Sequence, residues 1–211
     1  ADGCVTLGTD MAATLAGAGV AAEKITVVPN WAPAGVAALP RAAGRALRDA
    51  WGLGDRFVIA YSGNLGRVHD LEPVLAIAAL LRDEPALAFV FIGEGAQRRR
   101  LEDETARLGL HNVTFHPPQP RAGLAAALAV GDVHLVTLLP GCERLVFPSN
   151  LAGIAAAGRP VLFIGPPDCE VARLVTQNDL GFAATRDDPG ATARRLRELA
   201  ADPAACARHA A

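Results

Sequence analysis

Phe57-Val58-Ile59-Ala60-Tyr61-Ser62-Gly63-Asn64-Leu65-Gly66-Arg67 is the stretch that decides the fold. It begins with an unbroken apolar run, as expected for a strand buried on both faces, and the glycine after the run predicts a turn. After the turn, apolar residues recur at helical spacing over 71–81. A buried strand, a glycine turn and a helix in this order form the first unit of an α/β fold.

The same alternation continues along the chain. Strands are predicted at 88–93, 112–116, 133–139 and 160–165, and helices at 101–110, after a cap at Asp168, and at 191–201. Buried strands separated by helices predict a parallel, doubly wound, Rossmann-like sheet. Ligands of such sheets bind at the carboxyl ends of the strands. The loops at 63–70, 93–97, 116–120, 139–150 and 165–170 are therefore the places to search for a site.

The first 56 residues have a different character. Residues 1–19 resemble the end of a strand followed by one helix, and a strand over 24–31 breaks at Pro29-Asn30. Residues 32–54 have the scattered Pro, Gly and Ala of a linker. We interpret 1–30 as a remnant of a preceding domain and 31–211 as the main domain. The absence of an initiator Met predicts that the chain is a piece of a longer protein.

Composition excludes several classes of function. The formal net charge is −2, with both signs mixed, which argues against nucleic acid as a partner. The four cysteines have no zinc or redox spacing, and the histidines do not pair with carboxylates at metal-ligand spacing, so no metal is expected. Arg98-Arg99-Arg100 is interpreted as a solvated helix face. With no signal peptide or membrane-spanning run in the sequence, we expect a cytoplasmic location.

The loop at 63–70 is a candidate phosphate site. Its glycines, Gly63 above all, would let the backbone approach a ligand, and the free amides of the following helix would receive a phosphate. Arg67 would add a charge-assisted contact, and His69 could donate when it is protonated. A tight turn with a surface arginine explains the same residues, so both interpretations stay open.

Two further loops are less specific. Gly93-Glu94-Gly95 follows a strand but lacks the third glycine of a dinucleotide fingerprint, so it indicates a loop beside a ribose or base, or a simple turn. The loop at 116–120 holds three prolines, and there Pro117 and Gln119 would offer acceptors and donors to a base edge. A purely structural loop is an equally good explanation.

The most informative segment is 139–150, which leads into a helix. Ser149 is a plausible N-cap, and the free amides at Asn150 and Leu151 would face a diphosphate. Glu143 could accept hydrogen bonds from sugar hydroxyls. The alternative is an ordinary strand–loop–helix connection with an exposed Glu–Arg pair.

The order of these segments resembles the C-terminal, donor-binding domain of the retaining GT-B-fold glycosyltransferases of group 1, or family 4. The resemblance rests on KITVVPNW (24–31), YSGNLG (61–66), FIGEG (91–95), NVTF (112–115), GDV (131–133), PSNL (148–151) and AAGRPV (156–161). It covers nearly the whole chain. Each motif is modest, but their order and spacing together are specific.

The resemblance implies metal-independent, retaining transfer of a sugar from a UDP- or GDP-sugar, with no cofactor, to a saccharide or lipid-linked acceptor. It implies polysaccharide biosynthesis, an acceptor-binding N-terminal domain, and peripheral association with the inner face of the membrane. Arg67 and Glu143 are then the expected catalytic residues. The expected donor-binding residues are Gly63, Asn64, Arg67, His69, Gly93, Gly95, Pro117, Ser149, Asn150 and Leu151.

Several positions depart from the family pattern. Asn64 and His69 stand where the family has Arg and Lys, Asn150 stands for a Lys, and Gly153 stands for a Glu that holds ribose hydroxyls. The partner of that Glu falls at 145, or at Glu143 after a small shift. Three lost polar contacts would each cost about 1–3 kcal/mol of binding. A non-catalytic binding or assembly module is therefore the first alternative, and a nucleotide-sugar epimerase is the second.

Overall fold

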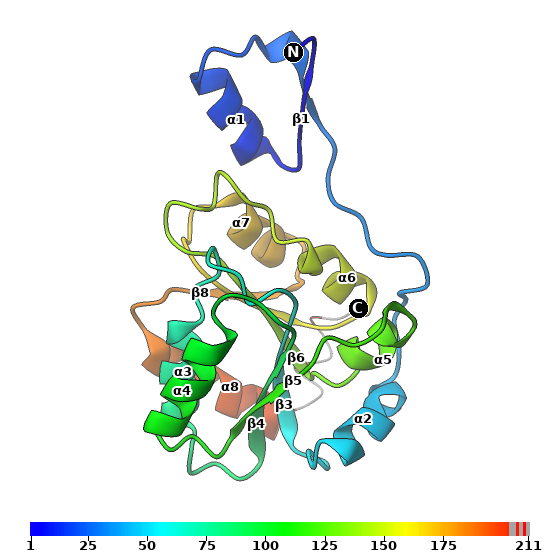
Figure 1. Ribbon diagram of the computed structural model, residues 1–211, viewed down its shortest axis with the longest axis vertical. Helices are drawn as coiled ribbons and strands as arrows, with labels where there is room; N and C mark the ends of the chain where they lie inside the picture. The colour runs from blue at the N-terminus through cyan, green and yellow to red at the C-terminus, as the bar shows by residue number, and fades with distance from the viewer. Residues whose placement is uncertain (203–205, 207–208, 210–211) are drawn as a thin grey trace.

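The apolar runs form one parallel sheet, as the sequence predicts. The computed structural model describes residues 1–202, 206 and 209. Its main sheet has six strands in the order β5-β4-β3-β6-β7-β8, all parallel (Figure 1). The strands are β3 Phe57–Ser62, β4 Leu87–Ile92, β5 Val113–His116, β6 Val133–Thr137, β7 Val161–Ile164 and β8 Gly181–Ala184. The order reverses between β3 and β6, which is the doubly wound arrangement.

Helices cover both faces of this sheet. They are α2 Arg45–Ala50, α3 Glu72–Leu80, α4 Arg98–Arg107, α5 Leu124–Leu128, α6 Asn150–Ala156, α7 Glu170–Gln177 and α8 Pro189–Ala201, with the 3-10 turns η2 Arg41–Gly44 and η3 Arg121–Gly123. Helices α3, α4 and α8 share one core cluster with the sheet, whereas α2, α5, α6 and α7 contribute to two clusters on the other face. The expected α/β fold class is confirmed.

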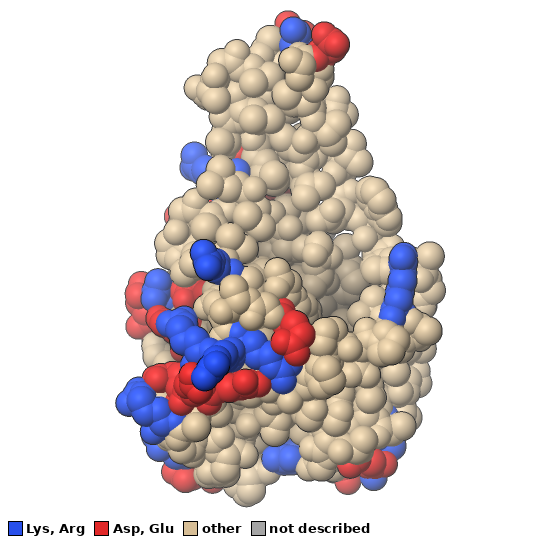
Figure 2. Space-filling view, viewed as in Figure 1, with Lys and Arg blue, Asp and Glu red and all other residues tan. Residues whose placement is uncertain are grey.

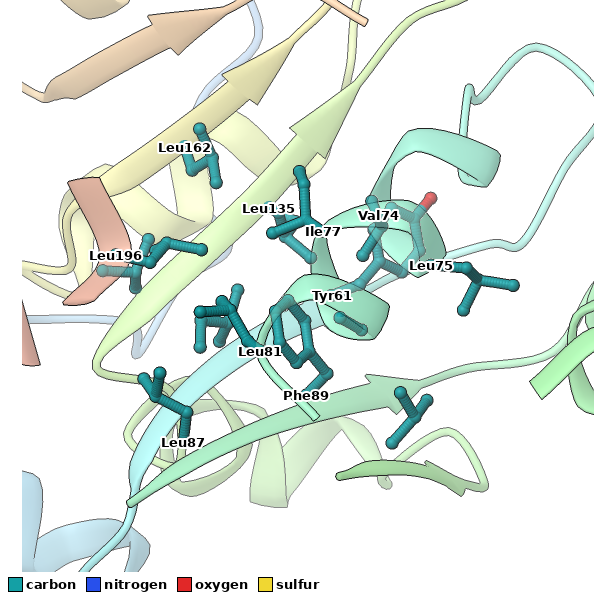
Figure 3. Close-up of a cluster of buried hydrophobic side chains, with 14 of the residues drawn as sticks. Tyr61, Val74, Leu75, Ile77, Leu81, Leu87, Phe89, Leu135, Leu162 and Leu196 are labelled. Carbon is teal, nitrogen blue, oxygen red and sulfur yellow. The ribbon is translucent and has the colours of Figure 1, made fainter. Parts of the chain in front are cut away.

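Successive side chains of each strand point alternately into the hydrophobic cores on the two faces of the sheet. Ile59 and Tyr61 of β3 lie in the cluster under α3 and α8, and Val58 and Ala60 lie in the cluster under α2. Figure 3 shows Tyr61, Phe89, Leu135, Leu162 and Leu196 converging with the apolar side of α3. Burying each large apolar side chain contributes about 1.5–3 kcal/mol, which is why the strands are predominantly apolar.

The arginine run at 98–100 is a paired helix surface. Arg98 bridges Glu94 and Glu102, at 2.7 and 2.8 Å, and Arg100 pairs with Glu72 at 2.5 Å. Figure 2 shows these charges gathered over the position of α4, whereas the upper part of the same view carries few. The prediction of a solvated face is confirmed for Arg99 and Arg100, which are exposed, whereas Arg98 is partly buried and also donates to the carbonyls of Gly93 and His116.

A small N-terminal unit stands apart from the main sheet (Figure 1). It consists of β1 Cys4–Thr6, α1 Thr9–Gly17, the 3-10 turn η1 Ala22–Lys24 and β2 Ile25–Val27, and β1 pairs with β2 in parallel. The predicted helix and the strand that ends before Pro29 are both present. The assignment of 1–30 to a preceding domain remains a prediction, as does the main-domain range 31–211, whose residues 203–205, 207–208, 210 and 211 lie outside the described part.

Two local predictions were wrong or incomplete. Asp168 does not cap α7, because the N-cap position is Cys169 and the amide of Glu170 donates instead to Asp10 of α1, at 2.7 Å. In return, the Glu170 carboxylate accepts from the amides of Thr9 and Asp10, both at 3.0 Å. The two helix N-termini therefore cap each other across the two units. The edge strand β8 was also not predicted.

Candidate functional site

Two cavities open at the carboxyl ends of the strands, one on each side of the loop after β3. The first has a volume of about 430 Å³, and its wall includes Gly63, Asn64, Gly93 and Asn150. The second has the same volume, and its wall includes Arg67 and His69. A larger cavity of about 670 Å³ lies between α3 and α4, away from the strand ends. The strand-end position makes the first two cavities the candidate site.

The first cavity has apolar and polar walls. Pro118 and Gln119 approach from the loop after β5, and Leu124 and Ala127 from α5. Asn150, the first residue of α6, donates from Nδ2 to the Ser62 carbonyl at 3.2 Å. An apolar wall with a few fixed amide groups suits a flat aromatic ring that carries polar edges.

The glycines of the two neighbouring loops pack backbone against backbone. Gly63 N–H donates to Ile92 O at 3.0 Å, and Leu65 N–H donates to Glu94 O at 2.8 Å, so the pairing of β3 with β4 continues into the loops. A Cβ on Gly93 would lie 1.9 Å from Gly63 O, and one on Gly95 would lie 2.5 Å from Leu65 O. Neighbouring backbone, rather than open space for a ligand, therefore explains why Gly93 and Gly95 are glycines.

Asn64 and Arg67 lie on opposite sides of this loop. Asn64 is exposed beside the first cavity, and its carbonyl accepts from the Tyr61 hydroxyl at 2.7 Å. Arg67 is exposed beside the second cavity and makes no hydrogen bond or ion pair with any residue that the structure describes. Its guanidinium is therefore available to an anion.

His69 is engaged by the backbone. Its Nδ1 lies 2.9 Å from the carbonyl oxygen of Thr137. Because a carbonyl only accepts, Nδ1 must carry a proton, and Nε2 is then an acceptor in the neutral ring. His69 can donate to a phosphate through Nε2 only when the imidazole is protonated.

An acidic and a basic group lie deeper in the second cavity. Asp70 is almost fully buried, with Arg186 at 3.4 Å. Burial raises the pKa of the Asp70 carboxyl, and the nearby Arg186 partly opposes that shift. Arg100 also lines this cavity but is paired with Glu72. Arg67 is therefore the cavity's one arginine without a partner among the described residues.

Five predicted site residues, Gly95 and four others, lie outside the described walls of both cavities. The Glu143 carboxylate accepts from its own loop, at the Gly141 N–H, 2.6 Å away. Leu151 is buried in the core with Leu128, and the Ser149 hydroxyl makes no capping bond although the residue occupies the N-cap position. The Pro117 carbonyl accepts from the Gln119 side chain at 3.1 Å. The ligand roles of these residues remain predictions.

The structure also places residues that were not singled out as site residues. Gln97, Asp70 and Arg186 line the second cavity. Arg186 follows the unpredicted strand β8, so no local signal marked it. A Cβ added at Gly153 would lie 3.7 Å from Pro33 Cδ and 4.0 Å from Leu128 Cδ1, so a long side chain there would meet packed atoms.

Within the described residues, no group of three or more His, Cys, Asp and Glu side chains is arranged to hold a metal ion. Over the same part of the chain, no helix has the length and apolar character needed to cross a bilayer.

Several named proteins are similar to this chain in sequence. The family model "Glycosyl transferases group 1" matches residues 45–211. WcaI of Escherichia coli (strain K12), named for colanic acid biosynthesis, is 41% identical over 144 residues, which is 66% of this chain and 35% of that protein. WbjE of Pseudomonas aeruginosa, named as a glycosyltransferase, is 32% identical over 205 residues, covering 94% of this chain and 50% of that protein. The chain thus spans half or less of the length of these relatives.

Solved structures share the fold. Anabaena Alr3699/HepE in complex with UDP and glucose superposes with a TM-score of 0.81 at 19% identity, over 100% of this chain and 56% of that one. Sucrose-phosphate synthase from Thermosynechococcus elongatus superposes with a TM-score of 0.76 at 22% identity, over 100% of this chain and 52% of that one. The Rossmann-like half of a GT-B fold, predicted from the order of the motifs, is confirmed. The family model covers most of the chain, and the chain therefore belongs to the group 1 glycosyltransferases.

Proposed function

We propose that this chain is the donor-binding half of a glycosyltransferase that takes its sugar from a UDP- or GDP-sugar. The observation that carries the proposal is the guanidinium of Arg67, which has no partner among the described residues and lies on a glycine loop between two cavities at the strand ends. The structures of HepE in complex with UDP, with UDP-glucose, and with UDP and glucose support UDP as the first ligand to try.

The two cavities suggest how the donor lies. The base and ribose would occupy the first cavity, against Leu124 and Ala127, with Gln119 at the base edge. The diphosphate would cross the loop toward Arg67, whose charge stabilises the nucleotide as it departs with the electrons of the sugar–oxygen bond. The sugar would then lie toward the second cavity. Glu143 would reach its hydroxyls only after leaving the Gly141 amide.

Several features of the whole protein are proposals of the same kind. We infer retention of configuration and no need for a metal or cofactor, as the family resemblance implies. The acceptor would be a saccharide or a lipid-linked saccharide in polysaccharide biosynthesis, which the name of WcaI supports. A lipid-linked acceptor lies in a membrane, so we propose a cytoplasmic protein that associates peripherally with the membrane's inner face.

We further propose that residues 1–30 belong to an acceptor-binding domain. In support, β1 and β2 form only a two-stranded sheet, and such a pair is marginally stable alone. Val5 and Val27 on these strands are 68% and 38% exposed, as expected for a sheet that continues elsewhere. Transfer needs both domains around the donor, so we expect the 211-residue chain alone to be inactive. Measured turnover by this chain would contradict that expectation.

Calorimetric titration of the chain with UDP, GDP and ADP tests the proposal. We expect saturable binding of UDP or GDP, and at least tenfold weaker binding in Arg67→Ala, about 1.4 kcal/mol. Arg99→Ala removes the same charge from the exposed face of α4 and should leave affinity unchanged. Unchanged affinity in Arg67→Ala would remove Arg67 from the phosphate site.

Failure of all three nucleotides to bind a folded chain would refute the donor-site proposal. A non-catalytic binding module would then be the better explanation, since Asn64, Asn150 and Gly153 replace the family's polar contacts. A product assay on the full-length protein separates the other alternative, because release of an epimer instead of a glycosylated acceptor would indicate an epimerase.

A further inference from the structure

Gln97 joins the start of α4 to the loop that carries Arg67. Its side-chain amide donates to the Gly66 carbonyl at 2.5 Å and to the His69 carbonyl at 2.9 Å. Its backbone N–H donates to the Leu65 carbonyl at 3.0 Å. One residue thus binds three carbonyls of the loop.

These carbonyls bracket Arg67. His69 N–H donates to Gly66 O at 3.2 Å, which closes a four-residue turn with Arg67 and Val68 at its corner. Gln97 therefore holds both ends of the turn from the α4 side. From the β6 side, Leu139 N–H donates to the Val68 carbonyl at 2.9 Å. The backbone on both sides of Arg67 is fixed.

A charged pair orients the Gln97 amide. Arg100 donates from Nη2 to the Gln97 Oε1 atom at 3.2 Å, while its Nη1 pairs with Glu72 at 2.5 Å. Because Arg100 can only donate, the oxygen of the amide must face it, and the NH₂ group must face the loop carbonyls. Glu72, Arg100 and Gln97 thus form a chain of contacts that ends on the loop.

We propose that Gln97 is a positioning residue for Arg67. By fixing the turn, it holds an exposed, unpartnered guanidinium at the cavity before the ligand arrives. The diphosphate then binds without first ordering the loop, and avoiding that ordering cost raises affinity. This inference rests on the proposed donor site, because it takes the nucleoside diphosphate as the ligand of Arg67.

A double-mutant cycle with UDP as the probe tests the inference. Gln97→Leu keeps a similar volume but removes both side-chain donors. We expect it to weaken UDP binding about tenfold in the wild-type background and less than about twofold in the Arg67→Ala background, because Gln97 acts through Arg67. Gln177→Leu, at the exposed end of α7, is the matched control and should change neither affinity.

Equal losses in both backgrounds, or no loss in either, would overturn the inference. Gln97→Glu is a second variant that keeps the side-chain shape, faces the loop carbonyls with acceptors only, and should also weaken binding. Circular dichroism and thermal unfolding of each variant separate a local effect from loss of the fold.

Amide hydrogen exchange without ligand separates this inference from the proposed function. In Gln97→Leu, the His69 amide should exchange at least tenfold faster, while amides of the central strand β3 stay protected. Unchanged exchange at His69 would refute the positioning role whether or not UDP binds. If exchange responds but the wild-type chain binds no nucleotide, the proposed donor site is refuted, and only the ordering of the loop by Gln97 stands.

Discussion

Gly93→Ala is the substitution that most directly tests the packing of the two loops. Gly93 directly follows β4 and has a φ of 154°, a backbone conformation that residues with a Cβ rarely adopt. Its added Cβ would lie 1.9 Å from the Gly63 carbonyl oxygen and 3.0 Å from the carbonyl carbon. The clash is with backbone, so no rotation of a side chain can relieve it.

Two costs add at this position. Backbone strain at such a φ costs about 1–3 kcal/mol. Forcing a methyl group into packed atoms costs about another 1–3 kcal/mol. We therefore expect a loss of about 4 kcal/mol in the free energy of unfolding. For a chain of this size, about 2–4 °C of Tm is lost per kcal/mol, so Tm should fall by about 8–16 °C.

Two glycines provide matched controls. Gly109 has a φ of 64° and no atom within 4 Å of an added Cβ, so Gly109→Ala measures the conformational cost alone, about 1–2 kcal/mol. Gly123 has an ordinary φ of −94° and equally open space, so Gly123→Ala should be close to neutral. Urea unfolding and thermal melts of the three variants give the comparison. If Gly93→Ala costs no more than Gly109→Ala, the contact with Gly63 does not exist as described.

Two other predictions concern stability. Glu170→Gln keeps an acceptor for only one of the amides of Thr9 and Asp10, turns an NH₂ group toward the other, and loses the charge at two helix N-termini. The substitution should lower the free energy of unfolding by about 1 kcal/mol and speed amide hydrogen exchange at the start of α1. Unchanged exchange there would contradict the reciprocal capping of α1 and α7. Burial lowers the pKa of His134 to about 4, so the folded ring stays neutral while the unfolded ring, at 6.5, takes up a proton. The contribution of neutral His134 to the free energy of unfolding is complete above pH 6.5, and about 3 kcal/mol of it is lost as the pH falls to 4. Between pH 7 and 4.5, urea unfolding should therefore show a smaller drop in the free energy of unfolding for His134→Gln than for the wild-type chain. An equal drop in the two proteins would refute the lowered pKa of His134.

The sheet could be predicted because a strand that is buried on both faces is mostly apolar, and this pattern is visible in the local sequence. β3, β4 and β7 are apolar runs, β6 is apolar apart from His134 and Thr137, and each strand is followed by a turn or loop. β8 leaves no such trace, because it is an edge strand, only half buried, and it begins with Gly181. A Cβ there would lie 2.0 Å from the Val161 carbonyl oxygen, so the pairing of β8 with β7 requires a glycine at this position.

The site was predicted at the level of loops, but the direction of each side chain was not. Asn64 and Arg67 are three residues apart and face different cavities, because the intervening backbone turns. That turn depends on Gln97, which is 30 residues beyond Arg67 in the sequence. The cap of α7 likewise comes from Asp10 in another unit. Contacts between segments that are distant along the chain produce no periodic pattern in the sequence, so they could not be predicted from it.

The departures from the family pattern acquire a common explanation in the structure. Asn150 donates to the Ser62 carbonyl, and His69 binds the Thr137 carbonyl, so two side chains at positions of family cations hold the backbone instead. Arg100 and Arg186 are paired with carboxylates. Among the described residues of the second cavity, the charge of Arg67 alone is therefore left uncompensated. A diphosphate carries more than one negative charge, so this half of the site cannot neutralise it with side chains alone. Backbone amides, or cations from the proposed acceptor-binding domain, would have to supply the rest, and in the second case donor binding would be coupled to closure of the two domains.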